Sequence, residues 1–285
     1  MPGTPLSALL PDLGRRTLLM GVLNATPDSF SDGGRYSDPD AAIEAGLRML
    51  AAGADLVDVG GESTRPGSDP VSLDEELARV IPVIEGLSAL GIEGISVDTT
   101  KAEVARQAVA AGAAVVNDIS ALRFDPEMAA TVAELGVAVV LSHTRDKPKT
   151  MQEGDLSYEG GVVSAVRASL QDSLQLAAAA GVQHDQIILD PGLGFGKTLA
   201  QNLELVRGLE QLSALGCPLL VGPSRKTFIG ELVNKDPEGR DPGTAAVAAL
   251  LVRYGAQIVR VHDVPMMHDV LKVADAIERG VAPPA

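Results

Sequence analysis

Short runs of Val, Leu and Ile recur eight times along this chain of 285 residues, and helix-like segments lie between them. Runs this short and this rich in β-branched residues are typical of buried strands. Because parallel neighbours need a long crossover between them, a repeated strand–helix pattern predicts a parallel sheet. The expected strands span residues 18–24, 56–62, 95–100, 114–120, 138–144, 187–192, 218–224 and 258–264.

The helix-like segments carry recognisable start and stop signals. Asp-Pro pairs open three of them, at 38–39, 125–126 and 241–242, which fits an N-cap followed by proline in the first turn. Several segments end in glycine, as helix C-termini prefer. The expected helices span 38–54, 73–91, 101–113, 125–136, 162–181, 202–216 and 241–256.

Eight strand–helix units predict an α/β fold, the single-domain (β/α)8 TIM barrel, which typically has about 250 residues. We expect residues 1–16 to form an N-terminal extension and residues 17–280 to form the barrel. A doubly wound open sheet is the alternative fold, but it would not need eight such regular units.

Composition excludes several classes of function. A net charge of −15 argues against a general affinity for nucleic acid, whose phosphates need a basic face. No apolar run approaches the ~18 residues of a membrane span. The N-terminal segment lacks the order of a signal peptide, because prolines interrupt it and Arg15 and Arg16 follow its apolar patch. Cys217 is the only cysteine, which fits a cytoplasmic protein without disulfides.

Polar side chains gather where each expected strand ends. All C-terminal strand ends of a barrel meet at one face, where active sites lie. A single such residue would suggest a strand cap or an internal hydrogen bond, but eight ends of the same polarity predict a shared site. The residues in question are Asn24, Glu62, Ser63, Thr64, Arg65, Asp98, Asn117, Asp118, His143, Asp190, Ser224, Arg225, Lys226, Arg260, His262 and Asp263.

These groups fall into two chemical sets. Asp98, Asn117 and Asp190 offer carboxylate and amide groups that suit a flat heterocycle with several N–H donors. Arg65, Lys226, Arg260 and His262 are basic, and a guanidinium can stack on a ring or bind phosphate oxygens in a forked geometry. Asn24 offers a neutral oxygen of the kind that Mg²⁺ accepts beside substrate phosphates.

One tempting motif fails. The segment "GLGFGKT" (192–198) resembles a phosphate loop, but the position that requires the first glycine is Pro191. The segment follows Asp190-Pro191 at a strand end, which favours a flexible lid instead. The four histidines, in turn, lack the spacing of metal ligands.

Seven segments together carry a family resemblance. In chain order they are "GVLNATPDSFSDGG", "VDVGGESTRPG", "SVDTTKAEVA", "NDIS", "DPGLGFGK", "GPSRKTFIG" and "RVHDV". This series resembles the signature of the dihydropteroate synthase family from about Leu18 to Asp275. The resemblance implies a pterin-binding barrel, usually a homodimer. It also implies a transferase that joins 6-hydroxymethyl-7,8-dihydropterin pyrophosphate to p-aminobenzoate, releases pyrophosphate with Mg²⁺, and is a sulfonamide target.

The resemblance also implies roles for individual residues. Asp98, Asn117 and Asp190 match the positions that bind the pterin, and Arg260 matches the arginine that packs on its face. The pyrophosphate and Mg²⁺ site matches Asn24, Arg260 and His262. Catalytic roles fall to Asp32, Arg65, Asp98 and Lys226. Substrate-binding positions are Thr64, Pro66, Asp98, Asn117, Asp190, Phe195, Lys226, Thr227, Arg260 and His262, of which Pro66, Phe195 and Thr227 face p-aminobenzoate.

The implied mechanism is dissociative: pyrophosphate leaves first, and the loop after Asn24 then keeps water from the pterin cation. One departure from the family lies in the fifth strand, where Ser142-His143-Thr144 replaces the usual Met-His-Met. A water molecule or a neighbouring side chain would have to fill the space at Ser142. Two alternatives stay open: a paralogue that binds pterin without turnover, and a methyltetrahydrofolate-type methyltransferase of the same barrel group, which would lack "PSRK" and the "TPDSFSDGG" loop.

Overall fold

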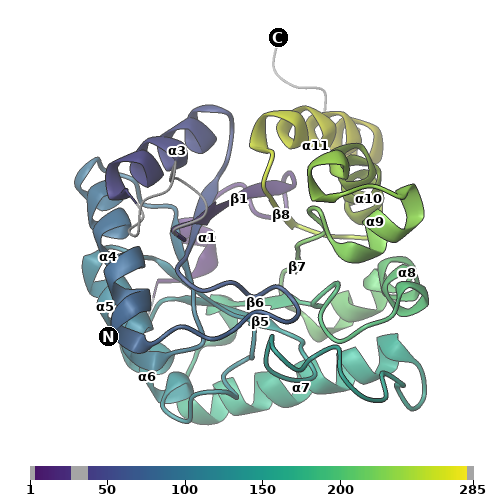
Figure 1. The fold of residues 1–285 in the computed structure, drawn as a ribbon, viewed down its shortest axis with the longest axis horizontal. Helices are drawn as coiled ribbons and strands as arrows, with labels where there is room; N and C mark the ends of the chain where they lie inside the picture. Colours follow the sequence, from purple (N-terminus) through teal and green to yellow (C-terminus); the bar gives the residue numbers. More distant parts are fainter. Residues whose placement is uncertain (1–3, 27–37, 281–285) are drawn as a thin grey trace.

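Eight parallel strands form a barrel ringed by helices in the computed structural model of the chain, which describes residues 4–26 and 38–280 (Figure 1). The strands follow the order β6-β5-β4-β3-β2-β1-β8-β7, and every pairing in the sheet is parallel. A parallel bridge from Leu189 in β6 to Leu219, just before β7, joins the two ends of this order. The predicted TIM barrel is therefore confirmed, and the open doubly wound sheet is excluded.

All eight predicted strands are present, most of them shorter at the C-terminal end than the apolar runs suggested. Their bounds are β1 (Leu18–Asn24), β2 (Leu56–Gly60), β3 (Ile95–Asp98), β4 (Val115–Asp118), β5 (Ala138–Ser142), β6 (Ile187–Asp190), β7 (Leu220–Val221) and β8 (Ile258–Val261). The residues that follow each strand belong to loops at one end of the barrel, so the polar residues at 62–65, 143–144 and 224–226 lie on loops.

Helices α3 to α10 lie between successive strands on the outside of the barrel, whereas α1 precedes β1 and α11 follows β8. Their bounds are α1 (Leu6–Leu9), α3 (Pro39–Ala51), α4 (Leu73–Ala89), α5 (Ala102–Ala111), α6 (Met128–Leu135), α7 (Val162–Ala180), α8 (Leu199–Arg207), α9 (Thr227–Val233), α10 (Asp241–Arg253) and α11 (Val264–Arg279). None of the helices in the described part of the chain combines the length and the apolar character needed to cross a membrane.

Two features of the helices differ from the sequence prediction. The helix expected over 202–216 ends at Arg207 and continues after Gly208 as a 3-10 helix. A β-carbon at Gly208 would lie 2.6 Å from Val163, so close packing against α7 explains the glycine that interrupts the helix. Of the three Asp-Pro pairs expected to cap a helix, only Asp38 does so, through its side chain at the start of α3. Asp125 does not cap α6, which begins at Met128 after Glu127, and Asp241 does not cap α10, because its carboxylate binds Arg225.

The core has an outer and an inner part. The outer part packs the strands against the surrounding helices, mainly through Val, Leu and Ala. The inner part fills the barrel with residues such as Met20 and Val140, and Leu6 and Leu10 from the N-terminal segment pack against it. This end of the barrel is thus closed by α1, which leaves the opposite end for the loops that carry polar residues. The boundary between the extension (1–16) and the barrel (17–280) stays a prediction.

Candidate functional site

A cavity of about 380 Å³ opens among the loops at the C-terminal ends of the strands. Ten of the residues predicted for the site line it: Asn24, Thr64, Arg65, Pro66, Asp98, Phe195, Lys226, Thr227, Arg260 and His262. They come from segments that are far apart in the chain, so the predicted convergence on one mouth is confirmed. Asn117 and Asp190 are buried and do not line the cavity. Asn117 donates to Asp58, which in turn binds Arg260 of the cavity lining, and Asp190 lies close to Lys226 of the lining.

The deepest part of the site is a network around Arg260 of β8. Its Nε donates to Asp58 Oδ2 at 2.6 Å, and its Nη2 donates to Asp98 Oδ2 at 2.8 Å. The amide of Asn117 donates to the same oxygen of Asp58 at 2.9 Å. Four strands therefore contribute to one polar network, in which two carboxylates face a single guanidinium. Such charge-assisted, geometrically constrained bonds fix the plane of the guanidinium.

The carboxyl group of Asp98 has an unusual environment. Burial raises the pKa of Asp98 to about 7; the charge of Arg260 opposes the rise, whereas Asp58, Glu76 and Asp118 add to it. One oxygen of Asp98, Oδ1, is buried without a hydrogen-bond partner among the described residues. A buried acceptor of this kind is costly unless a donor reaches it, so Asp98 is suited to receive an N–H group from a ligand.

Asp190 of β6 is held by two donors. The backbone N–H of Gly192 donates to its Oδ1 at 2.8 Å, and the hydroxyl of Ser142 donates to its Oδ2 at 3.1 Å. Burial raises the pKa of Asp190 above its usual value, and these two bonds and nearby Lys226 oppose the rise. Ser142, which stands where the family usually has methionine, thus binds a neighbouring side chain.

Lys226 lies over the ring of Phe195, with its Nζ 3.8 Å from the ring centroid. Burial lowers the pKa of Lys226 to about 8, and the charges of Asp190 and Asp98 oppose the fall. A lysine with this pKa is mostly charged near neutral pH but can release a proton at modest cost. Its contact with Phe195 places an aromatic wall and a cation side by side in the cavity.

The backbone turns sharply before Lys226. Arg225 adopts a left-handed conformation with φ of 56°, which is strained for a residue with a side chain. Contacts on every side hold it: its N–H donates to Thr244, its carbonyl accepts from Arg240, and its guanidinium forms a forked pair with Asp241 at 2.8 Å for both bonds. This turn directs Lys226 and the first residue of α9 towards the cavity.

His262 and Asn24 line the same cavity. The Nδ1 of His262 lies 2.9 Å from the hydroxyl of Ser224, which fixes the ring. Burial lowers the pKa of His262 to about 3, and the charges of Arg260 and Arg225 add to the effect, so the imidazole is neutral near pH 7. A neutral imidazole bonded at Nδ1 keeps Nε2 for an incoming ligand.

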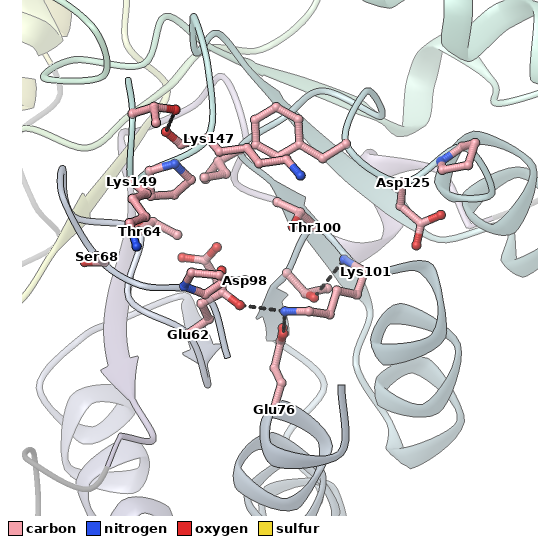
Figure 2. Close-up of a pocket in the computed structure, with 17 residues that line it drawn as sticks. Glu62, Thr64, Ser68, Glu76, Asp98, Thr100, Lys101, Asp125, Lys147 and Lys149 are labelled. Atoms are coloured by element: carbon pink, nitrogen blue, oxygen red, sulfur yellow. Dashed lines mark hydrogen bonds and ion pairs between the residues drawn. The ribbon is translucent and has the colours of Figure 1, made fainter. Parts of the chain in front are cut away.

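A second cavity of about 440 Å³ adjoins the first and shares Glu62, Thr64 and Asp98 with it. Figure 2 shows this cavity, with Lys101 bonded to two carboxylates near its base. The Nζ of Lys101 lies 2.5 Å from Glu62 and also forms an ion pair with Glu76, whose side chain is fully buried. Because Glu62 opens the loop that carries Thr64, Arg65 and Pro66, Lys101 ties this loop to helix α4.

The glycine-rich segment 192–197 is not the flexible lid that the sequence suggested. Its Leu193 and Phe195 are buried, and the Nζ of Lys197 lies within 3.0 Å of the carbonyls of Gly192 and Phe195 and of His143 Nδ1. A β-carbon at Gly192, where φ is 65°, would lie 1.9 Å from a backbone oxygen. The segment is therefore a packed wall of the site, in which the lysine of the rejected motif serves as an internal tie.

Burial also defines the character of His143. Burial lowers its pKa to about 2, and the neighbouring charge of Lys197 adds to this. His143 is thus a neutral, satisfied core residue rather than an acid or base of the site.

Asp32 and Phe30, predicted for the loop after Asn24, lie outside the described residues. Other participants were missed by sequence reasoning. Asp58 lies inside an apolar strand, and Lys101 and Glu76 follow ordinary helix patterns, so only their three-dimensional contacts reveal them.

Comparisons with known proteins agree with this geometry. Residues 20–262 match the family model described as "Pterin binding enzyme". The dihydropteroate synthase of Synechocystis sp. is 49% identical over 279 residues, which cover 98% of this chain and 96% of that protein.

Two solved structures share the fold closely. Dihydropteroate synthase from Clostridium difficile, crystallised in the presence of pteroic acid, has a TM-score of 0.88 and 43% identity and covers 94% of this chain and 99% of that one. The Xanthomonas albilineans enzyme with 4-aminobenzoic acid has a TM-score of 0.85 and 46% identity, with 94% of each chain covered. The similarity therefore spans the whole barrel and its cavity.

Proposed function

This chain belongs to the dihydropteroate synthase family of pterin-binding enzymes, and we propose that it performs the reaction of that family. It joins 6-hydroxymethyl-7,8-dihydropterin pyrophosphate to p-aminobenzoate, giving 7,8-dihydropteroate and pyrophosphate. The observation that carries the proposal is the cavity in which the acceptor Asp98 lies beside the cations Arg260, Lys226 and Arg65. A ring with N–H donors and a diphosphate leaving group needs this combination.

Recognition of the pterin falls to the buried polar groups. Asp98, Asn117 and Asp190 supply acceptors and an amide for the hydrogen-bonding edge of the ring. The Oδ1 of Asp98 supports this role, because it is buried and has no partner within the described chain. Arg260, held flat by two carboxylates, packs on the face of the ring.

The second substrate occupies the outer part of the cavity. Phe195 and Pro66 form apolar walls for the benzoate ring, and Thr64 completes the pocket. Thr227 offers its hydroxyl to the benzoate carboxylate. Lys226 lies between the pterin region and the p-aminobenzoate region, since its ammonium contacts the ring of Phe195 and the charges of both Asp190 and Asp98 oppose the fall in its pKa that burial causes.

The reaction begins with cleavage of the bond between the pterin methylene carbon and the diphosphate oxygen. The electron pair leaves with pyrophosphate, whose charge is met by Arg260, Arg65 and the free nitrogen of His262. The methylene cation that remains is delocalised through the ring and stabilised by Asp98 and Asp190, with Asp32 assigned to the same task. The amine of p-aminobenzoate then forms the C–N bond and gives up a proton to the released pyrophosphate, in a site from which the loops exclude water.

Mg²⁺ is the proposed cofactor, and bound there it would neutralise part of the diphosphate charge. Among residues 4–26 and 38–280, no three His, Cys, Asp or Glu side chains gather around a possible metal position. The donor set still fits, because Mg²⁺ often takes one or two protein oxygens and completes its shell with substrate phosphates and water. Asn24, at the end of β1 and within the cavity, would supply the protein oxygen.

Release of pyrophosphate tests the proposed function. We expect release from dihydropterin pyrophosphate to require p-aminobenzoate and to be blocked by a sulfonamide that competes for the same subsite. Tight pterin binding without release would support a binding paralogue instead, and methyl transfer from methyltetrahydrofolate would support the methyltransferase alternative.

The proposal extends to a cytoplasmic homodimer. Helices α10 and α11 pack side by side and expose large apolar side chains, including Leu250, Val273 and Ile277, the last 80% exposed. Exposed apolar side chains on neighbouring helices are typical of an interface between subunits. Light scattering coupled to size exclusion tests this, with Ile277→Asp expected to yield monomers and wild-type monomers counting against it.

A further inference from the structure

Asp58 lies in the middle of β2, and its side chain is fully buried. It is one of the few charged residues inside the barrel strands, and it does not line either cavity described above. Its place in the run "LVDVGG" predicts only an internal residue of a buried strand. Its contacts nevertheless connect it to Arg260 and Asn117, two side chains of the pterin-facing network.

One oxygen of Asp58 joins two side chains of that network. Oδ2 accepts from Arg260 Nε at 2.6 Å and from Asn117 Nδ2 at 2.9 Å, so β2 is tied to β8 and to β4. Arg260 then reaches Asp98 of β3 through its other nitrogen, Nη2. Asp58 thereby determines both the plane of the guanidinium and the direction of the Asn117 amide.

Stability alone does not explain a carboxylate at this position. Replacement of a buried ion pair by well-packed apolar residues is often neutral or stabilising, because both charges lose their hydration. The pair of Asp58 and Arg260 also comes with a second buried carboxylate, Asp98, so the cluster carries excess negative charge. A group that is costly to bury and that directs two ligand-facing side chains suggests a functional reason for its presence.

We propose that Asp58 is a positioning residue for the pterin site, which orients Arg260 and Asn117 and adds a fixed negative charge behind Asp98. This inference rests on the function proposed above. It assigns to β2 a part in pterin recognition that neither the motif pattern nor the cavity lining indicates.

The substitution Asp58→Asn tests the proposal, because it keeps the size of the side chain and removes its charge. We expect kcat/KM for dihydropterin pyrophosphate to fall by about 10- to 100-fold, the usual range for loss of a hydrogen bond to a charged group. The KM for p-aminobenzoate should change little, since Asp58 does not line the cavity that Phe195, Pro66 and Thr227 line. Asp55→Asn serves as the matched control, because Asp55 pairs with Arg16 just before β2 at the opposite end of the barrel.

A double-mutant cycle separates positioning from a general structural role. If Asp58 acts through Arg260, adding Asp58→Asn to Arg260→Met should cost little beyond the loss caused by Arg260→Met alone. Pterin binding measured by calorimetry supplies the comparison when turnover is too slow. If Asp58→Asn alone does not fold, Arg260→Met can still be compared with the double variant, since both lack the guanidinium that Asp58 holds. This comparison then decides whether Asp58 acts through Arg260.

The pH profile offers a further readout that a purely structural role would not move. The charged groups that face Asp98 are Asp58 of β2, Glu76 of α4, Asp118 of β4, Arg260 of β8 and Lys226 of the loop after β7. Asp58 raises the pKa of Asp98, so its neutralisation should shift the acid limb of kcat/KM for the pterin substrate to lower pH.

The outcomes are distinguishable. A wild-type enzyme that releases no pyrophosphate would overturn the proposed function, whatever Asp58 does. An active wild-type enzyme whose Asp58→Asn variant keeps kcat/KM within about threefold, a change too small for loss of a charged hydrogen bond, would overturn the positioning role. Fully additive losses in the double variant, or an unmoved acid limb, would overturn it as well.

Discussion

Removal of the Lys101 ammonium should destabilise the protein through the carboxylate that it leaves behind. Lys101 forms ion pairs with Glu62 and Glu76, and Glu76 is completely buried with its other oxygen unpartnered among the described residues. In the variant Lys101→Met, the apolar stem is retained while Glu76 becomes a buried charge without a counter-ion. This differs from loss of an ordinary surface pair, in which water replaces the missing partner.

The size of the effect follows from burial. Breaking a fully buried ion pair typically costs about 3–5 kcal/mol. The side chain of Lys101 is 26% exposed and that of Glu62 is 17% exposed, so water relieves part of the penalty. We therefore expect a loss of about 2–3 kcal/mol in the free energy of unfolding. With an unfolding entropy of about 0.6 kcal/mol per kelvin for a chain of this length, Tm should fall by about 3–5 °C.

Calorimetric unfolding with two comparison variants tests this reasoning. Lys149→Met is the matched control, because Lys149 binds Asp69 on the loop that also carries Glu62, but both side chains of this pair are mostly exposed. The Tm of Lys149→Met should stay at the wild-type value. Adding Glu76→Gln to Lys101→Met should restore most of the lost stability, because the stranded charge is gone. A Lys101→Met variant with wild-type Tm, or a double variant with no recovery, would refute the role assigned to the buried carboxylate.

Three further outcomes follow from the site. Ser142→Ala removes the hydroxyl that donates to Asp190 and should weaken pterin binding by about 3- to 10-fold, as loss of one hydrogen bond worth about 1 kcal/mol does; titration calorimetry measures it. Burial lowers the pKa of Lys197 to about 7, so between pH 7 and the usual lysine pKa the unfolded chain binds more protons than the folded one. The contribution of Lys197 to the free energy of unfolding therefore rises with pH in this range. Denaturant titrations at several pH values should show this rise, and it should be flatter in Lys197→Met. Arg260→Ala should lower turnover and pterin pyrophosphate affinity together, and it should also lower Tm, because Asp58 and Asp98 lose their shared cation. Wild-type kinetics in that variant would remove Arg260 from the site.

The fold and most of the cavity lining could be predicted from the sequence because they depend on repeated local signals. Each apolar run ends where the barrel ends, so Asn24, Asp98, Asp190 and Arg260 had to lie near one face once the barrel was inferred. The helix over 202–216 was wrong in its second half, since its interruption depends on close contact between Gly208 and Val163 from a different helix. Local propensity contains no information on such a contact.

The supporting residues were beyond sequence reasoning for a related reason. Asp58, Lys101 and Lys197 act through side-chain partners that lie 25 to 202 positions away along the chain, or through backbone carbonyls that have no sequence signature. The glycine-rich segment illustrates the difficulty: its glycines suggest mobility, whereas Gly192 is required because a side chain would collide with a backbone oxygen. A glycine serves either purpose, and only the surrounding structure distinguishes them.

An acidic protein that handles a diphosphate must separate its charges within the site. The carboxylates Asp58, Asp98 and Asp190 are buried, at most 7% exposed, whereas Arg65 is exposed on the loop at the mouth of the cavity. Under the proposed reaction, a ring bound against the carboxylates would direct its diphosphate outwards, towards the exposed Arg65. The field across the cavity would then favour the separation of a cationic methylene group from its anionic leaving group, since each charge develops beside groups of the opposite sign. Oriented charges of this kind need no rearrangement at the moment of bond cleavage, which explains why the barrel keeps a costly buried network behind its substrate site.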